Sequence, residues 1–222
     1  MLEIRVICEG PTDLEVIRAA LRARTDEDFN LVQLQPDGSL YGGDAGPHGG
    51  GWKGVRGYLE AAAQAGGLQA VGALRPEIDL LIVHLDADVA DEAEISCARP
   101  CPPALDTVDA LDALLRSWMN GPDLDPRIAF CLPSKATESW IIQAVIPSRK
   151  PADVDPECHP DPAALLLGGP RKLVRRRGPK LKKLRPAYAA LVPALTKAWP
   201  ELAVVSTTAK RFDDQLGQIL TG

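Results

Sequence analysis

Acidic residues follow two apolar segments of the chain, at positions that could bind a metal ion. Glu9 closes the β-rich run Leu2–Cys8, and Asp86 and Asp88 close the strongest apolar run, Ile78–Leu85. Residues two apart on extended backbone share a face, so we expect Asp86 and Asp88 to act together. If the two strands are neighbours, about 4.8 Å apart, three carboxylates converge. Such a cluster needs a cation, and an all-oxygen ligand set favours Mg²⁺ or Mn²⁺ over zinc.

The turn after Glu9 adds an anion-binding corner. Gly10 and the helix that begins near Thr12 offer free backbone amides beside the carboxylates. A phosphate placed there, bridged by metal to acids on the next strand, is the arrangement of metal-assisted phosphodiester cleavage or transfer. Asp13 could supply a further ligand, although an acid in the first turn of a helix is also favoured by the helix dipole alone.

The elements that position these acids alternate between strands and helices. We expect strands at residues 2–8, 31–35, 78–85 and 127–132, and helices at 12–24, 55–65, 104–119 and 137–145. This order predicts an α/β fold with a mostly parallel sheet and right-handed crossovers. Ligands of such sheets bind outside the carboxyl ends of the strands, which is where Glu9 and Asp86 lie.

The chain after residue 146 has weaker signals. We expect helical segments at residues 162–167 and 186–199, a short strand at Ala203–Val205 and a helix at 208–220. Residues 1–146 are therefore interpreted as the α/β core, and residues 147–222 as a helical C-terminal extension that carries a basic segment.

Basic residues are concentrated in one part of this extension. The net charge is −5, yet residues 171–185 contain nine basic and no acidic residues, which leaves sixteen basic against thirty acidic residues elsewhere. The nine are Arg171, Lys172, Arg175, Arg176, Arg177, Lys180, Lys182, Lys183 and Arg185. Such a segment indicates either contact with a polyanion or a solvated loop and helix start. Because it has no aromatic residue, it fits phosphate tracking better than base stacking.

The composition sets further limits. With 45% hydrophobic and 25% charged residues, the chain has the composition of a globular protein. No apolar run reaches the length needed to cross a bilayer, and Glu3 and Arg5 interrupt the first apolar stretch, which is atypical of a signal peptide. We therefore expect a cytoplasmic protein whose five cysteines stay reduced thiols.

Two of these motifs resemble those of a known protein family. Glu9-Gly10-Pro11-Thr12-Asp13 and Asp86-Ala87-Asp88 resemble the motifs of the Toprim domain, in particular those of the OLD-family and RloB-like small Toprim proteins of bacterial defence loci. The resemblance implies that Glu9, Asp86 and Asp88 hold divalent metal, that Glu9 also acts in proton transfer, and that Asp13 binds a second metal.

A third segment, Ser134–Trp140, is similar to a short acidic motif of the same proteins. It implies that Glu138 is a further acidic site residue and that Lys135 stabilises phosphate charge. The resemblance implies a nuclease that acts on DNA or RNA, tRNA included, beside an ATPase of the ABC or AAA type. The chain's own Gly49–Gly54 lacks the ending of a Walker A motif, so ATP use would belong to the partner.

Two other functions fit the same residues. The chain could be a non-catalytic binding module of Toprim fold that docks on an ATPase. It could also be a small-molecule phosphotransfer or nucleotide-binding enzyme, in which the carboxylates act but the basic segment does not.

Overall fold

The fold is built on a four-stranded parallel sheet, as seen in a computed structural model that describes residues 1–37, 46–95, 97, 101–121, 123–151 and 153–221. The strand order is β2-β1-β3-β4, and all neighbouring pairs are parallel. The strands are β1 (Leu2–Ile7), β2 (Phe29–Gln35), β3 (Leu80–His84) and β4 (Ile128–Cys131). Every residue of β3 is buried, as expected for a strand covered on both faces. The predicted α/β fold class is confirmed, and β1 and β3 are neighbours.

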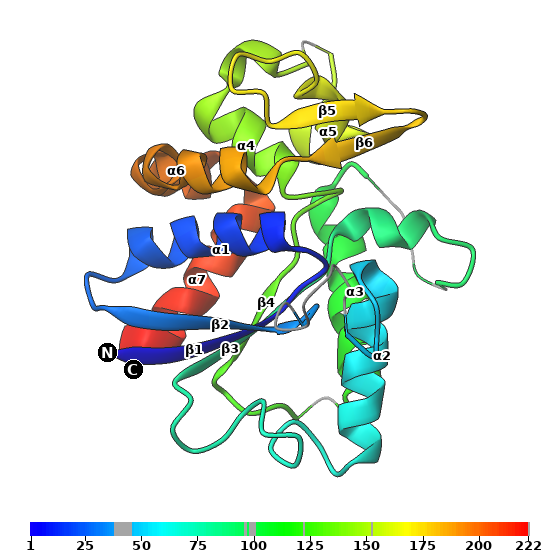
Figure 1. Cartoon of the computed structure of the whole chain (residues 1–222), viewed down its shortest axis with the longest axis vertical. Helices are drawn as coiled ribbons and strands as arrows, with labels where there is room; N and C mark the ends of the chain where they lie inside the picture. The colour runs from blue at the N-terminus through cyan, green and yellow to red at the C-terminus, as the bar shows by residue number, and fades with distance from the viewer. Residues whose placement is uncertain (38–45, 96, 98–100, 122, 152, 222) are drawn as a thin grey trace.

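Helices cover both faces of the sheet (Figure 1). Alternate residues of β3 separate the two layers: Leu80 and Ile82 pack with one group of helices, and Leu81 and Val83 with the other. The first layer contains α1 (Pro11–Arg24), α4 (Glu138–Val145), α6 (Arg185–Val205) and α7 (Thr207–Thr221); the second contains α2 (Gly51–Gln64) and α3 (Ala104–Trp118). The chain also contains four short helices, η1 (Ala87–Asp91), η2 (Pro147–Arg149), η3 (Pro156–Cys158) and α5 (Pro162–Leu165).

The helix α7 protects the edge of the sheet at β4. The side-chain amide of Gln215 accepts a hydrogen bond from the backbone N–H of Phe130 at 2.9 Å and donates one to its carbonyl at 3.2 Å. These two bonds replace a neighbouring strand at that residue, because an edge strand otherwise leaves its outer backbone groups unpaired.

The C-terminal part of the chain is helical, as predicted, but not at every residue. The short strand expected at Ala203–Val205 is wrong: these residues end α6. Leu195, Trp199 and Leu202 bury one face of that helix at helical spacing, while Val204 is 82% exposed and has no sheet to join. Both α6 and α7 share one hydrophobic cluster with the sheet, and the division after residue 146 stays a prediction.

The basic segment forms a β-hairpin, where a loop and helix start were the local expectation. Strand β5 (Val174–Arg177) pairs antiparallel with β6 (Lys180–Lys183) through a two-residue turn. Gly178 has a φ of +60°, which suits the first central residue of a type II′ turn, and Pro179 follows it. Among the described helices, none is both long and apolar enough to cross a membrane.

Candidate metal centre

Three side chains meet where β1 and β3 end. Glu9, His84 and Asp86 each place one ligand atom within 4.8 Å of those of the other two. The backbone N–H of Asp86 donates to Oε1 of Glu9 at 2.7 Å, which joins the two strand ends. His84 is the last residue of β3, and its Nε2 lies 3.1 Å from Oδ1 of Asp86. A carboxylate pair with one imidazole is a donor set that divalent cations accept.

His84 is a site residue that the sequence analysis does not include among the expected metal ligands. It is fully buried, and its Nδ1 has no hydrogen-bond partner among the described residues. Residues two apart on extended backbone share a face, as the sequence analysis argued for Asp86 and Asp88. In the structure this holds instead for His84 and Asp86, which continue the row of Leu80 and Ile82 along one face of β3. A polar residue in an otherwise apolar buried strand was the signal that could have identified it.

A second acidic group adjoins the first, and a lysine neutralises it. Lys183, at the base of the hairpin, places Nζ 2.9 Å from Oε1 of Glu138 and 3.9 Å from Oδ1 of Asp13. The hydroxyl of Tyr188 donates to the same Oε1 of Glu138 at 2.5 Å. The other oxygen, Oε2, is buried with no hydrogen-bond partner in the described part of the chain. Glu138 therefore has one oxygen that a ligand or water could still engage.

Thr137 connects the two groups. Its backbone N–H donates to Oδ1 of Asp86 at 3.2 Å, and its hydroxyl donates to Oδ1 of Asp13 at 3.1 Å. The residue is fully buried at the start of α4, so these two carboxylates are held in fixed positions. Four of the expected metal ligands thus lie together: Glu9, Asp13, Asp86 and Glu138.

The pKa values of the cluster reflect several carboxyl groups that lie close together and away from solvent. Burial, followed by the charge on Asp86, raises the pKa of Glu9 to about 8. Burial also opposes ionisation of Asp86, but His84 and Lys183 hold its pKa below the ordinary value. For His84, burial disfavours the charged form, yet the negative charges of Asp13 and Asp86 raise its pKa to about 9. Burial raises the pKa of Glu138, against the effect of Lys183.

Asp88 lies beside the cluster for a different reason from the one expected. The chain leaves the extended conformation after Asp86 and enters η1, so Asp88 does not share a strand face with Asp86. Asp88 is exposed, and its backbone N–H donates to the carbonyl of Lys135 at 3.0 Å. Desolvation and the charge on Asp86 still raise the pKa of the Asp88 carboxyl to about 7. Asp88 thus faces solvent at the rim of the site.

Lys135 does not reach the acidic cluster in this structure. Its Nζ pairs with Oδ2 of Asp91 at 3.1 Å, and its backbone has a φ of +62°. The cation within the cluster is instead Lys183, which sequence analysis assigned only to the basic segment. The side chain of Arg185 is 57% exposed, and its Nε lies 3.5 Å from Oε1 of Glu15 on α1. The remaining seven basic residues of the segment are exposed: Arg171, Lys172, Arg175, Arg176, Arg177, Lys180 and Lys182.

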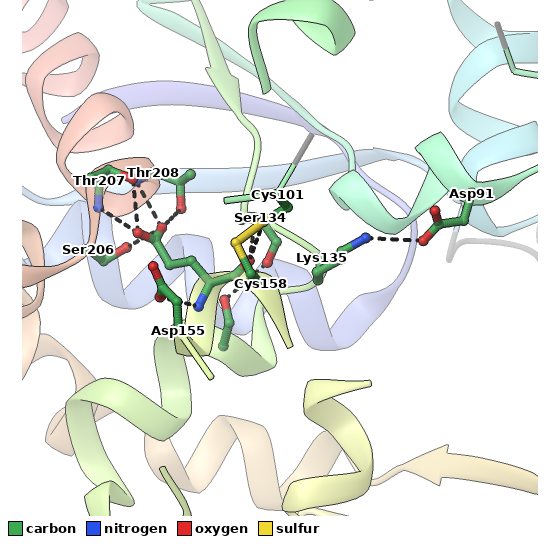
Figure 2. The surroundings of a disulfide bond; sticks show 11 residues. Asp91, Cys101, Ser134, Lys135, Asp155, Cys158, Ser206, Thr207 and Thr208 are labelled. Carbon is green, nitrogen blue, oxygen red and sulfur yellow. Dashed lines mark hydrogen bonds and ion pairs between the residues drawn. A yellow bond between two sulfur atoms is a disulfide. The ribbon is translucent and has the colours of Figure 1, made fainter. Parts of the chain in front are cut away.

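A disulfide lies beside Ser134, in the loop that also carries Lys135 (Figure 2). The expectation that every cysteine is a thiol is wrong for Cys101 and Cys158, whose Cα atoms lie 5.5 Å apart although 57 residues separate them in sequence. Next to Cys158, the carbonyl of Glu157 accepts a hydrogen bond from the hydroxyl of Ser134. The disulfide thus ties the segment before α3 to the segment that supports the Ser134 loop.

The buried carboxylate of Glu157 holds the start of α7. It accepts hydrogen bonds from the hydroxyls of Ser206, Thr207 and Thr208 and from two backbone N–H groups, at 2.5–3.1 Å. Figure 2 shows these three residues gathered at the beginning of the helix. A carboxylate at a helix N-terminus satisfies amides that have no intrahelical partner. Sequence analysis did not identify this contact.

Comparison of the chain with protein-family models, with curated proteins and with solved structures found no match. A functional proposal for this protein therefore depends on its own residues and their geometry.

Proposed function

We propose that this protein is a divalent-metal-dependent nuclease that hydrolyses phosphodiester bonds. The observation that carries the proposal is the meeting of Glu9, His84 and Asp86 at the carboxyl ends of two adjacent parallel strands, with their ligand atoms within 4.8 Å. Parallel α/β sheets bind ligands at this edge. The cluster crowds acidic groups in a buried place, where a bound cation would favour their ionised forms.

The residues present fit a divalent cation. Glu9, His84 and Asp86 would hold it, and the unpartnered Oε2 of Glu138 and the nearby Asp13 are further oxygen donors. When bound, such an ion supplies Lewis-acid polarisation of a phosphoryl group. Mg²⁺ and Mn²⁺ remain the proposed ions, and the imidazole of His84 favours Mn²⁺ of the two.

The chain's own residues have separable tasks in this proposal. Thr137 orients Asp86 and Asp13 through its backbone N–H and hydroxyl. Glu9, with a pKa raised to about 8, holds a proton near neutral pH in the metal-free protein and is suited to proton transfer. Lys183 supplies a fixed positive charge, which can offset charge that develops on phosphate oxygens. Lys135, paired with Asp91, would need to leave that partner to act.

The partner, the biological setting and the compartment are proposals of a different kind. The ABC- or AAA-type ATPase partner and the role in antiviral defence depend on the family resemblance alone. A cytoplasmic location is also proposed, and the Cys101–Cys158 disulfide is a bond that a reducing cytoplasm disfavours.

The test combines metal binding and cleavage in the same samples. Calorimetric titration with Mg²⁺ and with Mn²⁺ is run on the wild type, on Asp86→Asn and on the control Asp214→Asn, an exposed acid on α7 that pairs with Lys210 and is outside the metal cluster. The same samples are assayed on plasmid DNA, single-stranded DNA and tRNA. We expect Asp86→Asn to abolish metal binding and to lower cleavage by at least about 100-fold. Loss of a residue that only hydrogen-bonds to a metal ligand already lowers metal affinity or activity about 10–100-fold. Asp214→Asn should leave both near the wild-type level.

Two outcomes contradict the proposal. If neither ion binds the wild-type protein, the acidic cluster is structural. If metal binds but no nucleic acid is cleaved, with or without ATP and an ATPase partner, the protein is better described as a binding module.

A further inference from the structure

The β5–β6 hairpin separates the basic segment into two faces with different surroundings. Cross-strand partners on an antiparallel ladder share a face, and successive residues alternate. Val174 pairs with Lys183 and Arg176 with Leu181, which places these four on an inner face. On that face Val174 is buried, and Lys183 contacts the acidic cluster.

The opposite face of the hairpin is entirely cationic. Arg175 pairs with Lys182, and Arg177 pairs with Lys180. All four residues are exposed, and none forms an ion pair with any residue that the structure describes. Like charges placed directly opposite one another destabilise a strand pair, so this arrangement lowers the stability of the hairpin in isolation. We call these four residues the outer cationic face.

The base of the hairpin contacts acidic residues of the proposed site. Figure 1 shows the hairpin at the end of the molecule toward which the sheet strands point, with its turn directed away from the body. Its base is fixed by Lys183 at Glu138 and by Arg185 at Glu15. The hairpin is thus anchored beside the candidate metal centre through its inner face, and the outer cationic face lies on its other side.

We infer that the outer cationic face binds duplex DNA, with the hairpin lying in the major groove. A two-stranded β-ribbon fits the B-form major groove, which is about 12 Å wide, whereas the major groove of A-form RNA is too narrow for side chains to read. The hairpin has no aromatic residue to stack on unpaired bases, which disfavours single strands. The inference extends the proposed nuclease function and names duplex DNA as its substrate class.

The binding test is designed to be independent of cleavage. Fluorescence anisotropy is measured in EDTA with a 25-base-pair DNA duplex, an RNA duplex of equal length and a single-stranded DNA, across 50–200 mM KCl. The wild type is compared with a variant in which the outer cationic face is replaced by glutamine. A control variant removes the same charge from exposed positions elsewhere, by glutamine at Lys53, Arg75, Lys197 and Lys210.

The expected difference follows from counterion release. Each phosphate neutralised contributes about −0.9 to the slope of log K against log salt concentration, so four contribute about −3.6. Over a fourfold rise in KCl, the wild type should lose about 150-fold more affinity for duplex DNA than the outer-face variant loses. The control should keep the wild-type slope, and both RNA duplex and single strand should bind more weakly than duplex DNA.

An unchanged slope in the outer-face variant would overturn the inference, as would equal or tighter binding of the RNA duplex or of single-stranded DNA. Folding is checked by circular dichroism and thermal unfolding. The variant should fold at least as well as the wild type, because it removes two like-charge pairs. Since EDTA removes divalent metal, this result does not depend on whether the nuclease proposal holds, and the two can fail separately.

Discussion

The ion pair between Lys183 and Glu138 offers a sharp test of how the site is held together. Replacing Lys183 by methionine keeps an unbranched side chain, one atom shorter, but removes its charge. Glu138 has no exposed side-chain surface, so the substitution leaves a buried carboxylate whose hydrogen-bond donor, among the residues that the structure describes, is Tyr188 alone. We expect Lys183→Met to lower the free energy of unfolding by about 3–5 kcal/mol in metal-free protein, the usual effect of removing one partner of a buried pair.

The structure supports this magnitude. At the observed Nζ–Oε1 separation of 2.9 Å, an effective dielectric constant of about 20 gives a gross attraction of about 6 kcal/mol. Desolvation of the two groups offsets part of it, and side-chain exposure of 29% at Lys183 weakens it further. Burial raises the pKa of Glu138, so the orphaned carboxyl can bind a proton instead of staying charged. The loss should therefore be larger at pH 8 than at pH 5.

Urea unfolding in EDTA measures the effect, with Lys182→Met as a matched control. Lys182 is the preceding residue, on the exposed face of the same hairpin, and its replacement should change the free energy of unfolding by less than about 0.5 kcal/mol. The double variant Lys183→Met/Glu138→Gln should recover at least about 2 kcal/mol of the loss, since no buried charge remains. Equal effects of Lys183→Met and Lys182→Met, or no recovery in the double variant, would refute this reasoning.

Three further predictions concern stability. Glu157→Gln should lower the free energy of unfolding by at least about 3 kcal/mol in urea unfolding, because five donors lose a buried charged acceptor. Replacing Cys101 and Cys158 by serine should lower it by about 4 kcal/mol, the loop-entropy value for a loop of this length, and mass spectrometry of alkylated wild type should detect the bond. In EDTA, the melting temperature should fall from pH 5 to pH 9: Glu9 keeps a proton up to a pKa of about 8 and His84 up to about 9, so the folded state binds more protons than the unfolded state. Mn²⁺ should reduce this fall, and a melting temperature that rises with pH in EDTA would contradict it.

The sequence by itself predicted the sheet and the acids at its edge. Apolar runs such as Ile78–Leu85 identify buried strands locally, and alternation with helices implies parallel pairing. Parallel strands end at one edge, so acids that follow them, Glu9 and Asp86, come together without knowledge of any side-chain contact. Local pattern was less reliable where packing decides between two structures: Ala203–Val205 has strand propensity but continues α6.

The hairpin is an intermediate case. Gly178-Pro179 between two basic runs is a turn signal of the type that joins antiparallel strands. Hydrophobic periodicity gave no help there, because arginine and lysine occupy both faces of β5 and β6 at most positions.

Only the tertiary structure decided which charges meet. Lys183 contacts Glu138 and Asp13 across 45 and 170 residues of sequence, and Cys101 pairs with Cys158 across 57. Such contacts depend on the path of the whole chain around the sheet, whereas propensity and periodicity act over one or two turns of a helix or a single strand. The same physics separates Lys135 from the cluster: its neighbour Thr137 binds Asp86, but its own ammonium is directed to Asp91.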